Sequence, residues 1–314
     1  MRKHHLLGAI LLCGGLFSCS SEVIQQANYE IIPLPQEIKI STGNFVLNDR
    51  TSIVYPKGND EMQQNANLLA TYIRQMSGKK LKVIDEQITS NVITLTTGLN
   101  TDNAEAYQLK VTPDNIIIRG ASEAGTFYGI QTLRKSLPAT NKGDISLPGV
   151  EINDYPRFSY RGVHLDVSRH FFPIDSIKRF IDMMALHNIN RLHWHLTDDQ
   201  GWRIEIKKRP ELTTIGSKRS ATVIGHNSGE YDDVPYSGFY TQDEAKDIVR
   251  YAQERHITVI PEIDLPGHMQ AALAAYPELG CTGGPYEVWK MWGVSEDVLC
   301  AGNDKTLLFI EDVL

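Results

Sequence analysis

The first half of the chain alternates short apolar segments with two amphipathic stretches. Two segments, 61–77 and 122–137, carry apolar residues at helical spacing and end at Gly78 and Pro138, which predicts helices. Segments rich in β-branched or aromatic residues and bounded by Gly, Asn, Asp or Pro predict strands. These strands are residues 52–55, 81–84, 92–96, 107–112 and 115–119. The pattern predicts an α+β domain over residues 29–154, with the Gly/Pro-rich segment 141–152 as its connection to the second half of the chain.

From residue 155 onwards, strands and helices alternate regularly. Strands are predicted at 160–166, 191–196 and 258–264, and helices at 175–187 and 241–255. A strand–helix–strand rhythm at this spacing indicates βαβ units and a parallel sheet. In such sheets the functional site lies at the carboxyl ends of the strands.

The N-terminus has the pattern of an export signal. A basic start precedes an apolar run at residues 6–16, which is too short to span a bilayer of about 30 Å as a helix. The residues around Cys19 resemble a bacterial lipobox, so we expect residues 1–19 to be a lipoprotein signal peptide with lipidation at Cys19, followed by a spacer at 20–28. An ordinary signal peptide with an incidental cysteine is the alternative. The lipoprotein interpretation predicts an exported protein, anchored as an outer-membrane or periplasmic lipoprotein.

The charge and the cysteine content indicate which partners and which cross-links to expect. The net charge of −7 comes without a concentrated basic face, so no nucleic-acid partner is expected. Apart from the cysteines of the signal segment, Cys281 and Cys300 are the only pair. In an oxidising compartment we expect them to form a disulfide, with two free thiols as the alternative.

Three strand ends carry the unusual residues. The first predicted strand leads into Asp166 and Arg169, the second into a stretch from His193 to Arg203, and the third into a stretch from Glu262 to His268. Carboxylates and imidazoles gathered at one rim can set each other's protonation states and bind polar ligands.

The sequence around these strand ends resembles glycoside hydrolase family 20, the β-N-acetylhexosaminidases. The similarity rests on the motifs Arg-Gly-x-x-Leu-Asp-x-Ser-Arg-His, His-Trp-His-Leu-Thr-Asp-Asp-Gln-Gly-Trp-Arg and Pro-Glu-Ile-Asp-x-Pro-Gly-His, in this order. It covers the chain from about Tyr29 to its end. The resemblance implies an α+β N-terminal domain followed by an incomplete (β/α)8 TIM-type barrel, of which residues 155–314 would supply about the first three βα units.

The resemblance also implies roles for individual residues. Arg169 would bind the 3- and 4-hydroxyls of the terminal sugar through its planar fork of donors, or else form a structural ion pair with Asp166. Asp198 and His268 would form a support dyad behind the catalytic carboxyl group, with a structural His–Asp pair as the alternative. Asp264 would be a further charged support, and we interpret Glu262 as structural.

The family mechanism is substrate-assisted retention, in which the substrate's own 2-acetamido oxygen attacks the anomeric carbon. In the family an Asp orients that amide and the adjacent Glu is the general acid, in a His-x-Gly-Gly-Asp-Glu stretch. These 314 residues contain no Asp-Glu pair preceded by Gly-Gly. We therefore expect the chain to be a fragment that ends before the catalytic pair and has no meaningful glycosidase activity alone. The expected ligands are N-acetylhexosamine-terminated oligosaccharides or glycoconjugates, without cofactor or metal.

Two other functions are compatible with parts of the pattern. A metal-dependent hydrolase could use His193 and His195 at a strand end, with His268 completing a triad. A non-catalytic carbohydrate-binding surface lipoprotein could use Arg169 and tryptophan without a catalytic acid.

Overall fold

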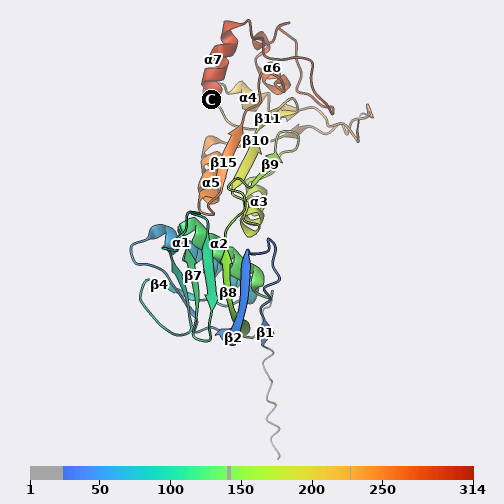
Figure 1. The fold of residues 1–314 in the computed structure, drawn as a ribbon. Helices are drawn as coiled ribbons and strands as arrows, with labels where there is room; N and C mark the ends of the chain where they lie inside the picture. The colour runs from blue at the N-terminus through green and yellow to red at the C-terminus, as the bar shows by residue number, and fades with distance from the viewer. Residues whose placement is uncertain (1–23, 140–142, 227) are drawn as a thin grey trace, which may run out of the picture.

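The computed structural model describes residues 24–139, 143–226 and 228–314. The expected signal peptide, its lipidation site Cys19 and the first part of the spacer lie outside these residues. The described part folds into two units (Figure 1). The N-terminal unit is a sheet covered by helices, and the second unit is built on parallel strands. None of the helices in this part is both long and apolar enough to cross a membrane.

Within the described residues, the N-terminal unit contains one mixed sheet with strand order β1-β8-β6-β7-β5-β3-β4, and β2 also pairs with β8. The strands are β1 (Gln25–Gln26), β2 (Glu37–Leu47), β3 (Ser52–Val54), β4 (Lys82–Ile84), β5 (Val92–Thr96), β6 (Tyr107–Val111), β7 (Asn115–Gly120) and β8 (Ile145–Asp154). Strands β6 and β7, both predicted from the sequence, pair antiparallel as a hairpin.

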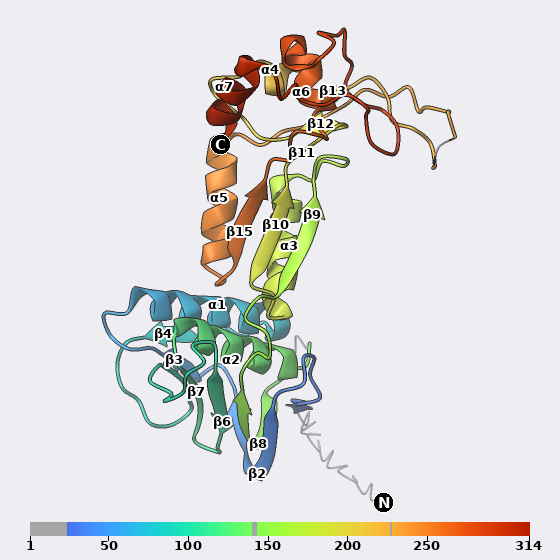
Figure 2. The same ribbon diagram turned by 45° about the horizontal axis from the view of Figure 1, so that its top comes forward.

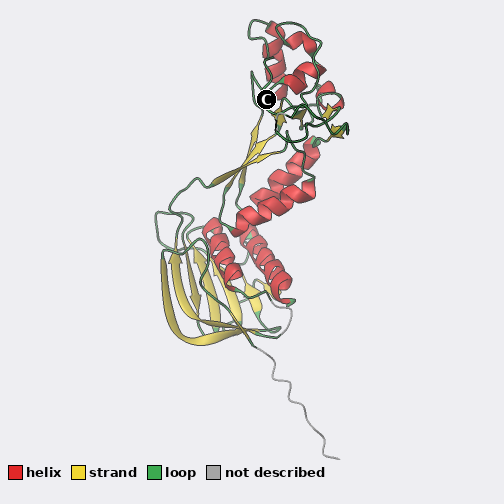
Figure 3. Cartoon of the chain, turned by 90° about the vertical axis from the view of Figure 1, so that its right-hand side faces the viewer, coloured by secondary structure: helices red, strands yellow, loops and turns green. Residues whose placement is uncertain are grey.

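Helices α1 (Asp60–Ser77) and α2 (Glu123–Ser136) cover one face of this sheet, as Figure 3 shows. Asn59 caps α1 by accepting a hydrogen bond from the backbone N–H of Met62, and Gly78 ends the helix in the left-handed conformation with a φ of 74°. Ser122 caps α2 in the same way through Gly125. Both predicted helices are therefore confirmed to within a few residues of their predicted ends.

The segment 141–152 is not the connection that its Gly and Pro content indicated. Most of it belongs to β8, where Ile145, Leu147, Val150 and Ile152 are fully buried. A bulge in β2 between Ile40 and Asn44 accommodates the irregular part of β8. Strand β2 was also missed, because most of its side chains are exposed and the polar residues 41–44 interrupt the alternation that Ile38 and Ile40 begin.

The second unit contains three parallel strands in the order β15-β10-β9, with strand bounds Gly162–Asp166 for β9, Arg191–His195 for β10 and Thr258–Glu262 for β15. Helices α3 (Ile174–Leu186) and α5 (Gln242–Gln253) follow the first two strands and pack against each other. In the described residues β15 pairs only with β10. These are the first units of a TIM-type barrel, so the predicted fold class is confirmed.

Short elements and loops lie beyond the carboxyl ends of the three strands, at the top of Figure 2. They are β11 (Thr197–Asp198), β12 (Gly201–Trp202), α4 (Glu211–Thr214), β13 (Lys218–Arg219), β14 (Tyr236–Ser237), α6 (Gln270–Ala275), the 3₁₀ helix η1 (Pro277–Leu279) and α7 (Asp304–Val313). Trp202 packs inside this region, 1% exposed and edge-on to Phe309.

Helices α1 and α2 lie between the N-terminal sheet and the barrel strands (Figures 1 and 2). An ion pair crosses this junction, because Arg161 donates two hydrogen bonds to the carboxylate of Glu105 at 2.8 and 2.9 Å. Asn190 and Tyr128 donate to the same carboxylate. Burial alone would raise the pKa of Glu105, but these donors lower it below its ordinary value.

Cys281 and Cys300 are free thiols in the structure, so the predicted disulfide is not formed there. Antiparallel pairing of Gly280 with Leu299 nevertheless brings them side by side, and a hydrogen bond to Cys300 raises the pKa of Cys281. The structure thus has the alternative, two free thiols, and spacing along the chain does not fix the oxidation state.

Candidate active site

Strand register places three ionisable side chains in one row at the carboxyl ends of the barrel strands. His195, the last residue of β10, lies opposite Asp166 in β9 and opposite Glu262 in β15. Successive side chains of a strand point to opposite faces, so these three share the inner face, whereas Trp194 packs into the core on the other face. The strand ends meet at one rim, as the sequence predicts.

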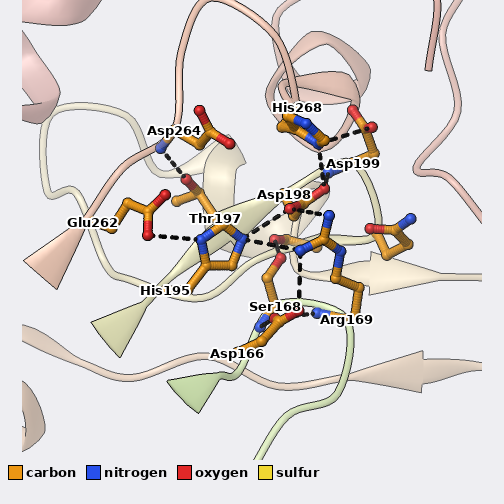
Figure 4. Close-up of polar contacts among 12 residues, drawn as sticks. Asp166, Ser168, Arg169, His195, Thr197, Asp198, Asp199, Glu262, Asp264 and His268 are labelled. Atoms are coloured by element: carbon orange, nitrogen blue, oxygen red, sulfur yellow. Dashed lines mark hydrogen bonds and ion pairs between the residues drawn. The ribbon is translucent and has the colours of Figure 1, made fainter. Parts of the chain in front are cut away.

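Asp198, in the short strand β11, is the centre of the polar network (Figure 4). Its Oδ2 lies 2.8 Å from Nε2 of His195 and 2.8 Å from Nη2 of Arg169. Its Oδ1 lies 3.0 Å from Nδ1 of His268 and accepts the backbone N–H of Asp199 at 2.7 Å. Burial alone would raise the pKa of Asp198, but His195, the Asp199 N–H, Arg169 and His268 lower it below its ordinary value.

The structure therefore brings Asp198 and His268 together, as the dyad interpretation requires. His268 follows β15 on a loop and adopts a φ of 57°, a left-handed conformation that residues other than glycine rarely take. Because Nδ1 faces Asp198, the opposite ring nitrogen is left for a second partner. The second ring nitrogen of such an imidazole can hydrogen-bond a neighbouring group, and the buried carboxylate affects the strength of that hydrogen bond.

The surroundings of Arg169 are compatible with both interpretations of its role, sugar binding and a structural ion pair. Its Nη1 lies 3.1 Å from Asp166 and its Nη2 lies 2.8 Å from Asp198, so the guanidinium is fixed by two carboxylates. Its side chain remains 40% exposed and lines a cavity of about 560 Å³. Other residues around this cavity include Asp166, His170, Gln200, Arg219 and Trp292. Arg169 is thus oriented by ion pairs and still has surface free to bind a ligand.

Asp264 lies beside the dyad without a side-chain contact to it. Its backbone N–H donates to the hydroxyl of Thr197 at 3.1 Å, and its carboxylate is within 4.8 Å of ligand-type atoms of Asp198 and His268. The geometry places Asp264 at the rim, and its supporting charge remains a prediction.

Asp199 is a functional-site residue that sequence reasoning did not single out. Its buried carboxylate accepts the backbone N–H of Gln270 at 3.1 Å and of Ser295 at 3.0 Å. It therefore ties two loops to the end of β11, and burial raises its pKa despite these hydrogen bonds. The adjacent pair of aspartates in the second motif was the signal that could have revealed it.

Glu262 and His195 also belong to this network, and their contact is one that the sequence alone could not show. Nδ1 of His195 lies 3.0 Å from Oε2 of Glu262, and Nε2 of His193 contacts the same oxygen. Burial alone would lower the pKa of His195, but Asp198 and Glu262 raise it to about 9. Glu262 has a pKa below its ordinary value, because His195 and His193 outweigh the effect of burial.

Two groups of side chains in the described residues have atoms close enough together to hold a metal ion. One is His164, His195 and Glu262, and the other is Asp198, Asp264 and His268. Hydrogen bonds and ion pairs already occupy both nitrogens of His195 and both oxygens of Asp198. The triad of His193, His195 and His268 that a metal-dependent hydrolase would need falls into neither group.

These features define a class of protein: a scaffold of TIM-type parallel strands whose rim carries a buried aspartate paired with a histidine and an arginine fixed by two carboxylates. Comparison with known proteins then specifies the family. The model of the glycosyl hydrolase family 20 catalytic domain matches residues 158–314, and the model of domain 2 of that family matches residues 28–155. The chain belongs to glycosyl hydrolase family 20.

Relatives and solved structures agree with this assignment. A beta-hexosaminidase of Porphyromonas gingivalis is 43% identical over 329 residues, which cover 99% of this chain and 41% of the relative. A beta-N-acetylhexosaminidase of Cellulomonas fimi is 34% identical, covering 90% of this chain and 55% of the relative. The chain thus spans about half the length of these curated relatives.

Among solved structures, the family 20 β-N-acetylhexosaminidase of Streptomyces coelicolor superposes with a TM-score of 0.80 at 35% identity, covering 90% of this chain and 56% of that one. An exo-β-N-acetylglucosaminidase of Vibrio harveyi, solved with N-acetylglucosamine, gives a TM-score of 0.76 at 30% identity and covers 92% of this chain and 45% of that one. Neither the metal-dependent nor the non-catalytic alternative gains support from these relatives, which are named as glycosidases.

Proposed function

We propose that this chain is part of a retaining β-N-acetylhexosaminidase that releases terminal N-acetylglucosamine or N-acetylgalactosamine from the non-reducing ends of glycans. The observation that carries the proposal is the pairing of buried Asp198 with His268, beside Arg169 at the rim of the barrel strands. Family membership and the hexosaminidase relatives support the same activity.

In the proposed reaction the 2-acetamido oxygen of the substrate attacks the anomeric carbon, and a general acid protonates the leaving oxygen. Family resemblance assigns the acid, and the Asp that orients the acetamido group, to a segment that follows a later barrel strand. His268 would stand behind that acid, with Nδ1–H donating to Asp198 and Nε2 facing the acid's carboxyl group. The pair would then keep the general acid protonated until it donates this proton to the leaving oxygen.

Arg169 would fix the sugar. Its guanidinium is held by Asp166 and Asp198, so little side-chain freedom is lost when its remaining donors bind hydroxyls of the terminal sugar. A neutral, hydroxyl-rich ligand suits this arginine, because two carboxylates already balance its charge.

The substitution Arg169→Lys tests the sugar-binding role. Lysine keeps the charge but cannot bridge Asp166 and Asp198 with a planar fork, so we expect kcat/KM for a chromogenic N-acetylglucosaminide to fall roughly 100-fold, mostly through KM. The enzyme would be expressed from its complete reading frame and assayed by nitrophenol release.

Arg209→Lys is the matched control, since Arg209 also pairs with a carboxylate, that of Asp312 at 2.8 Å, but lies away from the rim. We expect it to retain activity. Equal kcat/KM for Arg169→Lys and Arg209→Lys would contradict the assignment of Arg169 to substrate binding.

We also propose that the protein is exported and lipid-anchored through Cys19. The basic start, the short apolar run and the lipobox-like residues before Cys19 support this. Growth with an alkyne-bearing fatty acid should label the wild-type protein but not Cys19→Ala. Equal labelling of both would rule out anchoring at this cysteine.

A further inference from the structure

The proposed reaction uses Asp198 and His268 but leaves Glu262 and His195 without a role, although His195 touches the central carboxylate. We propose that Glu262 and His195 form a positioning pair that keeps Asp198 ionised and correctly oriented behind the catalytic acid. The inference rests on the proposed function and extends the support dyad to a chain of four: Glu262, His195, Asp198 and His268. In Figure 4 these side chains run across the rim from β15 through β10 and β11 to the loop that carries His268.

The two carboxylates that flank His195 favour a proton on each nitrogen of its ring. Nε2 lies 2.8 Å from Oδ2 of Asp198 and Nδ1 lies 3.0 Å from Oε2 of Glu262. An ionised carboxylate only accepts hydrogen bonds, so Nε2 donates to Asp198, whereas Nδ1 lies in ion-pair contact with Glu262 without forming a hydrogen bond. A neutral imidazole has one N–H and would turn a lone pair towards one of the two carboxylates. His195 therefore fits its site as an imidazolium.

The surrounding charges favour the same state. The ionisable groups around His195 are His164 and Asp166 from β9, Arg169 from the loop after β9, His193 from β10, Asp198 from β11 and Glu262 from β15. Three of them are carboxylates, and burial together with the neighbouring His193 and His195 lowers the pKa of His164, which favours its neutral form. The ring of His195 is only 5% exposed, so water does little to screen the two carboxylates that flank it.

Protonated His195 has a direct effect on Asp198. The Asp198 side chain is 0% exposed, and its Oδ2 is shared by His195 and Arg169. Arg169 Nη1 also lies 3.4 Å from His195 Nε2, and the carboxylate oxygen that both groups contact offsets the repulsion between these two cationic groups. If His195 lost its charge, Asp198 would lose one of its cations, its pKa would rise, and its hydrogen bond with His268 would weaken.

Glu262 contacts His195, so it acts on Asp198 only through His195. Its side chain is the partner that keeps Nδ1 of His195 protonated, and strand register fixes this contact because His195 and Glu262 are directly paired residues of β10 and β15. His195 contacts Asp198 and Glu262 contacts His195, so both are assigned as positioning residues. Their effect should appear in the pH dependence of the reaction rather than in its chemistry.

The test is Glu262→Gln in the protein expressed from its complete reading frame, labelled with ¹⁵N-histidine. In the wild type we expect the His195 ring, assigned by its loss in His195→Gln, to show two protonated nitrogens at pH 7.5. In Glu262→Gln the ring should deprotonate at lower pH. The alkaline limb of the kcat/KM profile should move to lower pH, and kcat/KM at neutral pH should fall roughly 10- to 100-fold, as for other residues that orient active-site groups.

His193→Gln is the matched control, because His193 also contacts Glu262 but does not touch Asp198. We expect it to change neither the pH profile nor the protonation of His195 appreciably. A neutral His195 in the wild type, or a Glu262→Gln profile identical to that of His193→Gln, would overturn the proposal. Complete absence of hydrolysis by the wild type would instead contradict the proposed function, while the NMR titration would still decide the state of His195.

Discussion

At the scale of single residues, the site is organised by charge compensation around buried carboxylates. Asp198 is inaccessible to water, yet four donors surround it, and Asp199 beside it is satisfied by two backbone N–H groups. Removing one partner from such a group leaves a buried charge unpaired, which costs more than the pair contributes when intact. Single substitutions here should therefore affect stability as well as activity.

His195 gives this network a characteristic pH dependence. Its pKa of about 9 in the folded state lies above its ordinary value of 6.5, so its stabilising effect is complete below about pH 6.5 and is lost as the pH rises towards 9. The free energy of unfolding from urea titrations should fall over this range by up to roughly 3 kcal/mol. In His195→Gln the slope between pH 6.5 and 9 should be flatter. Parallel slopes for both proteins would mean that His195 does not carry this charge.

At the scale of elements, local sequence signals were reliable where they were strong. Helix α5 begins at Thr241 with a complete capping box, in which Thr241 and Glu244 exchange hydrogen bonds, and the sequence predicts the start of the helix at this same residue. Strand β8 was missed because Pro148 and Gly149 indicated a loop, whereas pairing with β2 and β6 determines its conformation. Tertiary pairing of this kind leaves no periodic pattern that a single sequence can reveal.

The capping box also supplies a test of element stability. Thr241→Ala removes the side-chain oxygen that accepts the N–H of Glu244, and we expect a loss of about 1 kcal/mol in the free energy of unfolding. Lys246→Ala, an exposed change on the same helix, should cost less than half as much. Chemical denaturation of the two variants at one pH makes the comparison.

The candidate site shows the same division between what sequence predicts and what it does not. Arg169, Asp198, His268 and Asp264 were identified from motifs, and they lie at one rim because parallel strands end together. The contacts of Glu262 with His195, and of Asp199 with Gln270 and Ser295, depend on strand register and loop conformation. These are distances between residues far apart in the chain, which no local pattern encodes.

At the scale of the whole molecule, helices α1 and α2 of the N-terminal domain lie between its sheet and the barrel strands. The ion pair between Arg161 and Glu105 crosses this junction, with side chains only 14% and 20% exposed. One cluster of buried apolar residues also continues from the N-terminal domain into the barrel strands, so both apolar packing and this ion pair join the two domains.

Breaking this ion pair should loosen the junction. Arg161→Met leaves Glu105 without its cation in a partly buried position, and we expect a loss of roughly 3 kcal/mol. The double variant with Glu105→Gln should recover part of it, because no unpaired charge remains. Calorimetry gives both values, and a double variant no more stable than Arg161→Met would show that the charge is not the cause.

The central claim is that this scaffold serves a reaction in which the substrate's own acetamido group is the nucleophile. The most direct measurement compares two chromogenic substrates, the β-N-acetylglucosaminide and the β-glucoside, with the protein expressed from its complete reading frame. The account predicts rapid nitrophenol release from the first and at least about 1,000-fold lower kcat/KM for the second, because the glucoside lacks the attacking oxygen. Comparable hydrolysis of both substrates would contradict it.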